Sequence, residues 1–114
     1  VSSWSGNHVS LLSGVSYTSS KHALNAMTET INMKYCNLGI RATALCPGEV
    51  ATAILDKRPK KLSSEQKNKM LQPDDLGQTI VFLCQMPKHV CINELTISPT
   101  WHRRYIADLG IEEL

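Results

Sequence analysis

The chain has 114 residues, enough for one small domain and too short for two. Twelve basic and ten acidic residues leave a net charge of +2, which is too balanced to favour a nucleic acid or a membrane surface as partner. A hydrophobic content of 42% argues against a disordered chain, and no run of 18 apolar residues is present that would predict a membrane span.

The first half of the chain predicts a loop followed by a long helix. Residues 1–16 are rich in Ser and Gly, which favour turns, so they predict a strand end or a loop. Residues 17–38 contain neither Pro nor Gly, and Gly39 stands where a left-handed helix cap belongs. An apolar stripe at helical spacing supports a helix there; it consists of Ala23, Leu24, Ala26, Met27, Ile31 and Tyr35.

The second half alternates between strand and helix patterns. Residues 40–46 are mostly apolar and stop at a Pro-Gly pair, as expected of a strand buried on both faces. Residues 48–72 are irregular and polar, with room for one or two short helices. Pro73 suits the first position of a helix, and residues 90–97 predict a second strand. The tail from residue 99 has no clear period.

This order predicts an α/β fold with a parallel sheet, right-handed crossovers and helices on the sheet faces. Only two full strands and one strand end are present, fewer than a sheet usually has. We therefore expect residues 1–114 to be the carboxyl-terminal part of an incomplete doubly wound, Rossmann-like domain. It would contain only the last strands and their crossover helices. The start at Val1 also suggests a piece of a longer protein.

Neither the cysteines nor the histidines predict a metal site or a disulfide framework. The cysteines lie in apolar stretches without a CxxC pair, which predicts small buried hydrophobic residues; they are Cys36, Cys46, Cys84 and Cys91. The four histidines form no HxxxH or Cys/His cluster. Reduced cysteines and the lack of a signal pattern favour a cytoplasmic protein.

The strongest chemical signal is a Tyr-x-x-x-Lys motif at the start of the predicted helix. Tyr17 and Lys21 are four residues apart, which places both side chains on one helix face. A free tyrosine has a pKa near 10, and a nearby ammonium lowers that pKa by favouring the phenolate. A tyrosine tuned in this way exchanges a proton with an alcohol or carbonyl oxygen. Taken alone the motif is weak, because a Tyr and a Lys are often four apart on an ordinary helix.

The surroundings of this motif make it specific. Ser3 precedes Tyr17 at an apparent strand end, and a later strand ends in Pro-Gly-x-Val-x-Thr at residues 47–52. With the helix from Pro73 and the strand ending in Ser98-Pro99, this pattern resembles the short-chain dehydrogenase/reductase family over most of the chain. Nucleotide-sugar epimerases and dehydratases, which are non-redox relatives, share Tyr-x-x-x-Lys. The few residues after Thr100 fit a single-domain dehydrogenase better.

The resemblance implies specific roles for three residues. Tyr17 matches the family's proton donor or acceptor. Lys21 matches the lysine that lowers the tyrosine's pKa and binds the nicotinamide ribose. Ser3 matches the serine that polarises the substrate oxygen, although it lies one residue farther from the tyrosine than is common. Ser2 and Ser5 are weaker candidates for that role.

The resemblance also implies a cofactor, NAD or NADP, and a small carbonyl or secondary alcohol as substrate. The cofactor-binding set would be Tyr17, Lys21, Pro47, Gly48, Val50 and Thr52. Residues 53–70 would form the substrate lid; six of the twelve basic residues fall there, most simply as a solvated surface. A localisation signal and an anionic-substrate lid are the other interpretations of that basic run. The full-length protein would be a homodimer or homotetramer, with Thr30, Met33, Lys34 and Asn37 on the outer helix face.

One part of the family pattern is missing. These 114 residues contain no G-x-x-x-G-x-G turn, so neither the pyrophosphate-binding segment nor the residue that selects NAD or NADP can be identified. The alternative to an enzyme is therefore an inactive piece with no cofactor binding of its own.

Overall fold

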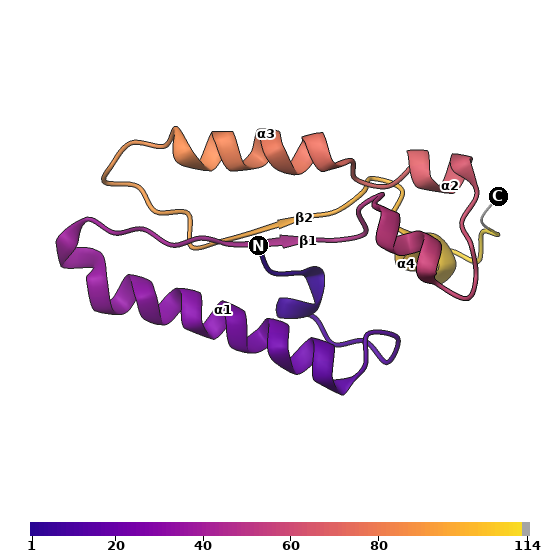
Figure 1. Cartoon of the computed structure of the whole chain (residues 1–114), viewed down its shortest axis with the longest axis horizontal. Coiled ribbons are helices and arrows are strands. Elements are labelled where there is room, and N and C mark those ends of the chain that lie inside the picture. The colour runs from indigo at the N-terminus through magenta and orange to yellow at the C-terminus, as the bar shows by residue number, and fades with distance from the viewer. Residues whose placement is uncertain (113–114) are drawn as a thin grey trace.

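The computed structural model describes residues 1–112 (Figure 1). Its elements in chain order are η1 (Trp4–Gly6), α1 (Val15–Tyr35), η2 (Cys36–Leu38), β1 (Ala44–Pro47), η3 (Ala53–Lys57), α2 (Ser64–Asn68), α3 (Pro73–Cys84), β2 (Glu94–Ile97) and α4 (Arg103–Asp108). Among the described residues, no helix is long and apolar enough to cross a membrane.

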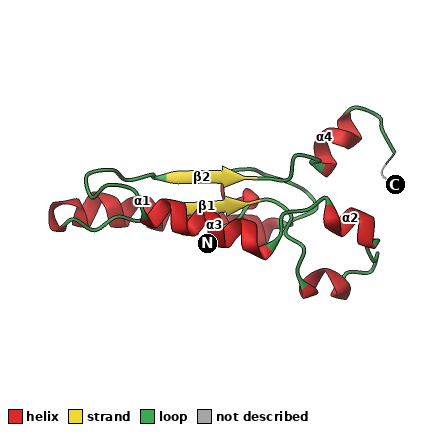
Figure 2. Cartoon of the chain, turned by 90° about the horizontal axis from the view of Figure 1, so that it is seen from above, coloured by secondary structure: helices red, strands yellow, loops and turns green. Residues whose placement is uncertain are grey.

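β1 and β2 form a parallel pair, in register from Ala44 opposite Glu94 to Pro47 opposite Ile97. Helix α1 covers one face of this sheet and α3 the other, as Figures 1 and 2 show from two directions. The backbone N–H of Ser2 donates to the carbonyl of Leu45 at 2.7 Å, whereas Ala44 and Gly48 donate toward the β2 side. β1 therefore lies between the start of the chain and β2. This confirms the predicted α/β class with a parallel sheet.

Helix α1 begins two residues before the predicted range and ends at Tyr35, and the 3-10 turn η2 continues to the predicted end at Leu38. Its last turn tightens into the 3-10 turn η2, and Gly39 adopts the left-handed conformation with φ 73°. The amide N–H of Gly39 donates to the carbonyl of Cys36. The chain then reverses toward β1, because a left-handed residue ends the helical hydrogen-bond pattern.

β1 is shorter than predicted, because side chains replace strand pairing at residues 40–43. Asn32 on α1 donates from Nδ2 to the carbonyl of Ala42 and accepts the Ala42 amide on Oδ1, both at 2.7 Å. Arg41 donates to three carbonyls of the turn after α3, at residues 86, 87 and 90. These bonds satisfy backbone groups that a longer ladder would otherwise pair.

Burial is concentrated on β1 and on the lid side of the molecule. All four β1 residues are buried, as predicted, but β2 alternates between exposed and half-buried residues. The core includes Ala44, Leu45, Cys46, Leu55, Met70, Leu71 and Ile106.

The predicted burial of the cysteines was wrong for two of the four. Cys36 and Cys84 are exposed, because they lie at helix ends away from β1, whereas Cys46 is fully buried. In the apolar stripe of α1, Met27 is 54% exposed, because the narrow sheet covers only part of that helix.

Replacing Gly39 with alanine is expected to destabilise the chain by about 1–2 kcal/mol, because a Cβ is strained at positive φ even where space is open. Gly77→Ala is the matched control. Gly77 lies inside α3 with nothing near its missing Cβ, so alanine there should stabilise by about 0.5–1 kcal/mol. Urea unfolding measures both changes, and equal effects at the two positions would contradict the assignment of Gly39 as a left-handed cap.

Candidate active site at the carboxyl end of the sheet

β1 and β2 both run toward the end of the molecule that carries η3, α2 and α4 (Figure 1). Pro47 ends β1, and the segment with Gly48, Val50 and Thr52 follows it directly. Open α/β sheets bind their ligands at this carboxyl edge. The loop residues that the sequence nominated therefore lie at the edge where a ligand is expected.

Tyr17 and Lys21 lie together on the first turns of α1. The Nζ atom of Lys21 is 5.6 Å from the centroid of the Tyr17 ring. Tyr17 is 47% exposed and Lys21 is half-buried. The predicted i, i+4 pairing is thus realised in space, and an ammonium lies beside a phenol ring that solvent and ligands can reach.

The three serines nominated from the sequence differ in their hydrogen bonds. Ser2 is buried and its hydroxyl contacts the Lys21 carbonyl at 3.4 Å, while the hydroxyl of Ser5, also buried, bonds that of Ser13. Ser3 is half-buried, and its Oγ accepts the Ser5 amide at 3.1 Å. That bond uses a lone pair of Ser3 and leaves its hydroxyl hydrogen free to donate.

Ser3 precedes η1 and Tyr17 lies on the neighbouring helix α1. No hydrogen bond joins the two residues within residues 1–112. The segment with Ser3 leads into η1, which packs on α1: Ser2 contacts Lys21, and a Cβ on Gly6 would lie 2.8 Å from the Asn25 side chain. A side chain at position 6 would therefore force the Ser2 and Asn25 side chains to move. The serine-containing turn is consequently held against the same helix that carries Tyr17 and Lys21.

The loop after β1 presents an unpaired donor and acceptor. Glu49 and Ala51 use their backbone groups in a parallel bridge to Leu71, accepting at 3.1 Å and donating at 2.8 Å. The residue between them, Val50, makes no backbone hydrogen bond within the described chain. Its N–H and C=O match the hydrogen-bonding groups of a primary amide. Thr52 beside it is exposed, and its side chain makes no capping bond.

Gly48 approaches the chain after β2 closely. A Cβ at this position would lie 3.3 Å from Cδ of Pro99 and 3.4 Å from Cβ of Ser98. The Gly48 amide donates to the carbonyl of Ile97 at 2.7 Å. Glycine therefore lets the chain after β1 approach the chain after β2 closely.

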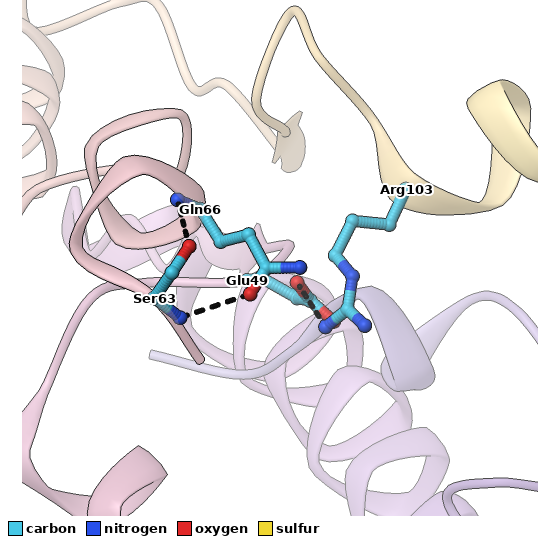
Figure 3. A network of polar contacts seen from close by, with 4 residues as sticks. All are labelled: Glu49, Ser63, Gln66 and Arg103. Atoms are coloured by element: carbon cyan, nitrogen blue, oxygen red, sulfur yellow. Dashed lines mark hydrogen bonds and ion pairs between the residues drawn. The ribbon is translucent and has the colours of Figure 1, made fainter. Parts of the chain in front are cut away.

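The segment expected to form the lid, residues 53–70, contains internal ion pairs and contacts the Trp101 ring through Lys69. Lys67 bonds Asp56 at 2.7 Å, and Lys69 lies 4.2 Å from the Trp101 ring centroid. Figure 3 shows Arg103 of α4 beside Glu49 at 3.4 Å, and Ser63 and Gln66 in the reciprocal bonds that begin α2. The hydrogen bond from Lys67, together with its positive charge, lowers the pKa of Asp56 below its usual value.

An aromatic stack adjoins the Ser3 segment and was not predicted as a unit. Trp4 stacks on His8 at a centroid distance of 3.9 Å, and His102 stacks on Tyr105 at 4.1 Å. Trp4 and His102 join the two pairs at 4.8 Å. The sequence nominated Trp4 and Tyr105 as packing or pocket-wall residues. The i, i+3 spacing of His102 and Tyr105 was the available signal for α4, but six residues are too few to show a period.

The fold is that of a Rossmann-like α/β protein, with helices on both faces of a parallel sheet. The family model described as "short chain dehydrogenase" matches residues 1–63, more than half of the chain. The chain belongs to the short-chain dehydrogenase family.

Individual relatives agree with this assignment. An uncharacterized oxidoreductase of Staphylococcus aureus is 29% identical over 87% of this chain and 40% of its own length. A human dehydrogenase/reductase of the same family is 31% identical over 88% of this chain and 42% of its own length. The solved alcohol dehydrogenase of Thermococcus sibiricus, complexed with 5-hydroxy-NADP, matches with a TM-score of 0.71 and 26% identity, covering 90% of this chain and 41% of that one. The chain thus spans about 40% of the length of the curated relatives it matches.

The Asp56–Lys67 pair predicts a defined pH response in the lid. Because the folded pKa of Asp56 is depressed, its contribution to stability is present above the unfolded value of about 3.8 and is lost as pH falls through the folded pKa. NMR titration should give Asp56 a midpoint below 3.8, and Lys67→Met should raise it. Lys57→Met is the control, because Lys57 does not contribute to the shift. An unchanged midpoint in Lys67→Met would contradict the pairing.

Proposed function

We propose that the chain carries the catalytic residues of an NAD(P)-dependent oxidoreductase that acts on a small carbonyl compound or secondary alcohol. The observation that carries the proposal is the placement of the Lys21 ammonium 5.6 Å from the ring of an accessible Tyr17. Family membership supports it, because the matched relatives are named as oxidoreductases and dehydrogenases. The substrate, the direction of the reaction and the oligomeric state are proposed for the whole protein.

In the reductive direction, the Tyr17 hydroxyl gives its proton to the substrate oxygen as that oxygen becomes an alcohol. The Lys21 ammonium stabilises the phenolate left behind by Coulombic attraction, which is strengthened where water is excluded. Ser3 donates its free hydroxyl hydrogen to the same oxygen and stabilises the charge that develops on it. Oxidation of an alcohol uses the same groups in reverse, with Tyr17 accepting the proton.

The residues after β1 fit the nicotinamide end of the cofactor. The unpaired N–H and C=O of Val50 complement a carboxamide, and Gly48 keeps the backbone beneath it close to Pro99. Pro47 ends the strand and Thr52 offers an exposed hydroxyl. The Lys21 ammonium would bind the ribose. When bound, the nicotinamide supplies or accepts the hydride. NAD and NADP are equally compatible with these residues, which hold only the nicotinamide end.

The remaining proposals concern the whole protein. We place it in the cytoplasm and assign it no nucleic-acid or membrane partner. A homodimer or homotetramer would use the outer face of α1, whose members are all exposed: Thr30, Met33, Lys34 and Asn37.

Tyr17→Phe in the longer protein is expected to lower kcat by about 10²–10⁴-fold, because the ring remains and only the transferable proton is lost. Tyr35→Phe is the matched control, since Tyr35 also lies on α1 beside a lysine, 5.4 Å from Nζ of Lys34, but at the other end of the helix. The kcat of the Tyr35→Phe variant should stay within about twofold of the kcat of the unaltered protein. Steady-state reduction of NAD and NADP with a panel of secondary alcohols measures both. Intact turnover in Tyr17→Phe would refute the mechanism.

The 114-residue chain alone is expected to bind NADH and NADPH poorly, because no glycine-rich turn is present to hold the pyrophosphate. Isothermal titration calorimetry should show no saturable binding of either cofactor at micromolar concentration. Micromolar affinity would contradict the view that these residues hold only the nicotinamide end. Turnover by the full-length protein, together with no cofactor binding by the 114-residue chain, would show that the whole protein is an enzyme and that these residues alone are an inactive piece of it.

A further inference from the structure

Helix α4 and the residue before it contact two segments of the candidate site that are far apart in the sequence. His102, the N-cap of α4, lies against the Trp4 ring, with ring centroids 4.8 Å apart. Arg103, the first residue of the helix, places Nη1 3.4 Å from Oε1 of Glu49 (Figure 3). One short helix therefore contacts the turn that begins at Ser3 through one residue and the loop after β1 through the next.

Trp4 is the large side chain of the turn whose backbone fixes Ser3. Ser3 is the N-cap of η1: its Oγ accepts the Ser5 amide at 3.1 Å, and its carbonyl accepts the Gly6 amide at 2.8 Å. The Trp4 carbonyl accepts the His8 amide at 3.0 Å, so hydrogen bonds close the turn. A displacement of the Trp4 ring would consequently move the backbone that orients the Ser3 hydroxyl.

His102 contacts Trp4 through its ring. The imidazole stacks on Tyr105, with centroids 4.1 Å apart and planes within 20°, and meets the Trp4 ring at 51°. Its Nδ1 atom is buried and has no hydrogen-bond partner among residues 1–112. Contacts of this kind depend on the faces and edges of the rings. A phenyl ring could therefore replace the imidazole without the loss of a hydrogen bond at Nδ1.

The second contact reaches the loop that we assign to the nicotinamide. Glu49 precedes Val50, and its backbone carbonyl accepts the Leu71 amide at 3.1 Å. The Arg103 guanidinium lies 3.4 and 3.5 Å from the two carboxylate oxygens of Glu49. Glu49 is thus held by both its backbone and its side chain. It lies directly before the residue whose N–H and C=O have no partner within residues 1–112.

We propose that His102 and Arg103 are positioning residues of the active site. His102 orients the Ser3 hydroxyl through the Trp4 ring. Arg103 holds the loop after β1 through Glu49. The inference rests on the proposed function, and it assigns neither side chain a contact with the reacting atoms. Helix α4 thereby sets where the serine hydroxyl lies relative to the bound nicotinamide.

The two contacts can be tested without turnover, by hydrogen exchange of the full-length protein measured with mass spectrometry. His102→Ala should speed exchange of the amides in residues 4–8, because their turn loses its ring contact. Arg103→Met should instead speed exchange in residues 49–52. Arg104→Ala is the matched control, since its side chain is exposed on the same helix, and it should alter neither segment. Unchanged exchange in either segment would overturn the inference and leave the proposed function standing.

Steady-state kinetics of the full-length protein should separate the two residues. His102→Ala should lower kcat by roughly tenfold with little change in the KM for the cofactor, because only the serine is misplaced. Arg103→Met should raise the KM for NAD or NADP with kcat nearly unchanged, and Glu49→Gln should do the same, because it removes the other half of the pair. Arg104→Ala should change neither constant. The same change of both constants in both variants would indicate lost stability alone and overturn the inference.

The route through Ser3 is tested by a double-mutant cycle. In a Ser3→Ala background the hydroxyl to be oriented is gone, so His102→Ala should lower kcat no further. His102→Phe keeps a ring beside Trp4 and should largely retain kcat in the unaltered background. If His102→Ala does not fold, Tyr105→Ala, which removes the outer ring of the stack, gives the same comparison with a smaller loss.

The outcomes of this cycle separate the inference from the proposed function. A further tenfold loss from His102→Ala in the Ser3→Ala background would overturn the inference. So would a loss in His102→Phe as large as that in His102→Ala. Both results would leave the proton transfer by Tyr17 standing. Intact turnover in Tyr17→Phe would instead overturn the proposed function and this inference with it.

Discussion

The site depends on the parallel pairing around β1. Leu45 accepts the Ser2 amide on one side of the strand, while its neighbours pair with β2 on the other. This pairing fixes where the chain leaves the sheet, and therefore where Ser3 meets α1. If β1 moved by one residue, its side chains would exchange faces and the buried Cys46 would lie on the opposite side. The strand pairing thus holds the serine turn on the helix that carries the tyrosine and lysine.

Amide side chains connect segments of the chain beyond the ends of the paired strands. Asn32 bridges α1 to residue 42, and Asn7 bridges the Ser3 turn to β2. Asn32 pairs with both backbone groups of Ala42 and so replaces a short length of strand ladder, whereas Asn7 bonds the side chains of Glu94 and Thr96. The ion pair of Lys67 with Asp56, in contrast, lies within the segment 53–70 and is partly exposed to solvent, so it contributes little to stability.

Much of the backbone could be predicted from local pattern. Gly39 predicted a left-handed cap and Pro73 predicted a helix start, and both were confirmed, because these residues restrict their own backbone. The apolar run before Pro47 correctly predicted a buried strand. Burial farther from the sheet was predicted less well, as exposed Cys36 and Cys84 show, since it depends on which neighbours are present.

The sequence by itself determined the strand–helix alternation, the motif of Tyr17 and Lys21, and the family that the motif indicates, because these depend on residue type and short spacing. Only the tertiary structure decided how the hydroxyl of Ser3 is bonded, that the Val50 backbone has no hydrogen-bond partner among residues 1–112, and that α4 brings His102 against Trp4. Those properties arise from contacts between segments distant in the chain. No local pattern encodes such contacts, because each partner is chosen by packing and by the geometry of the whole fold.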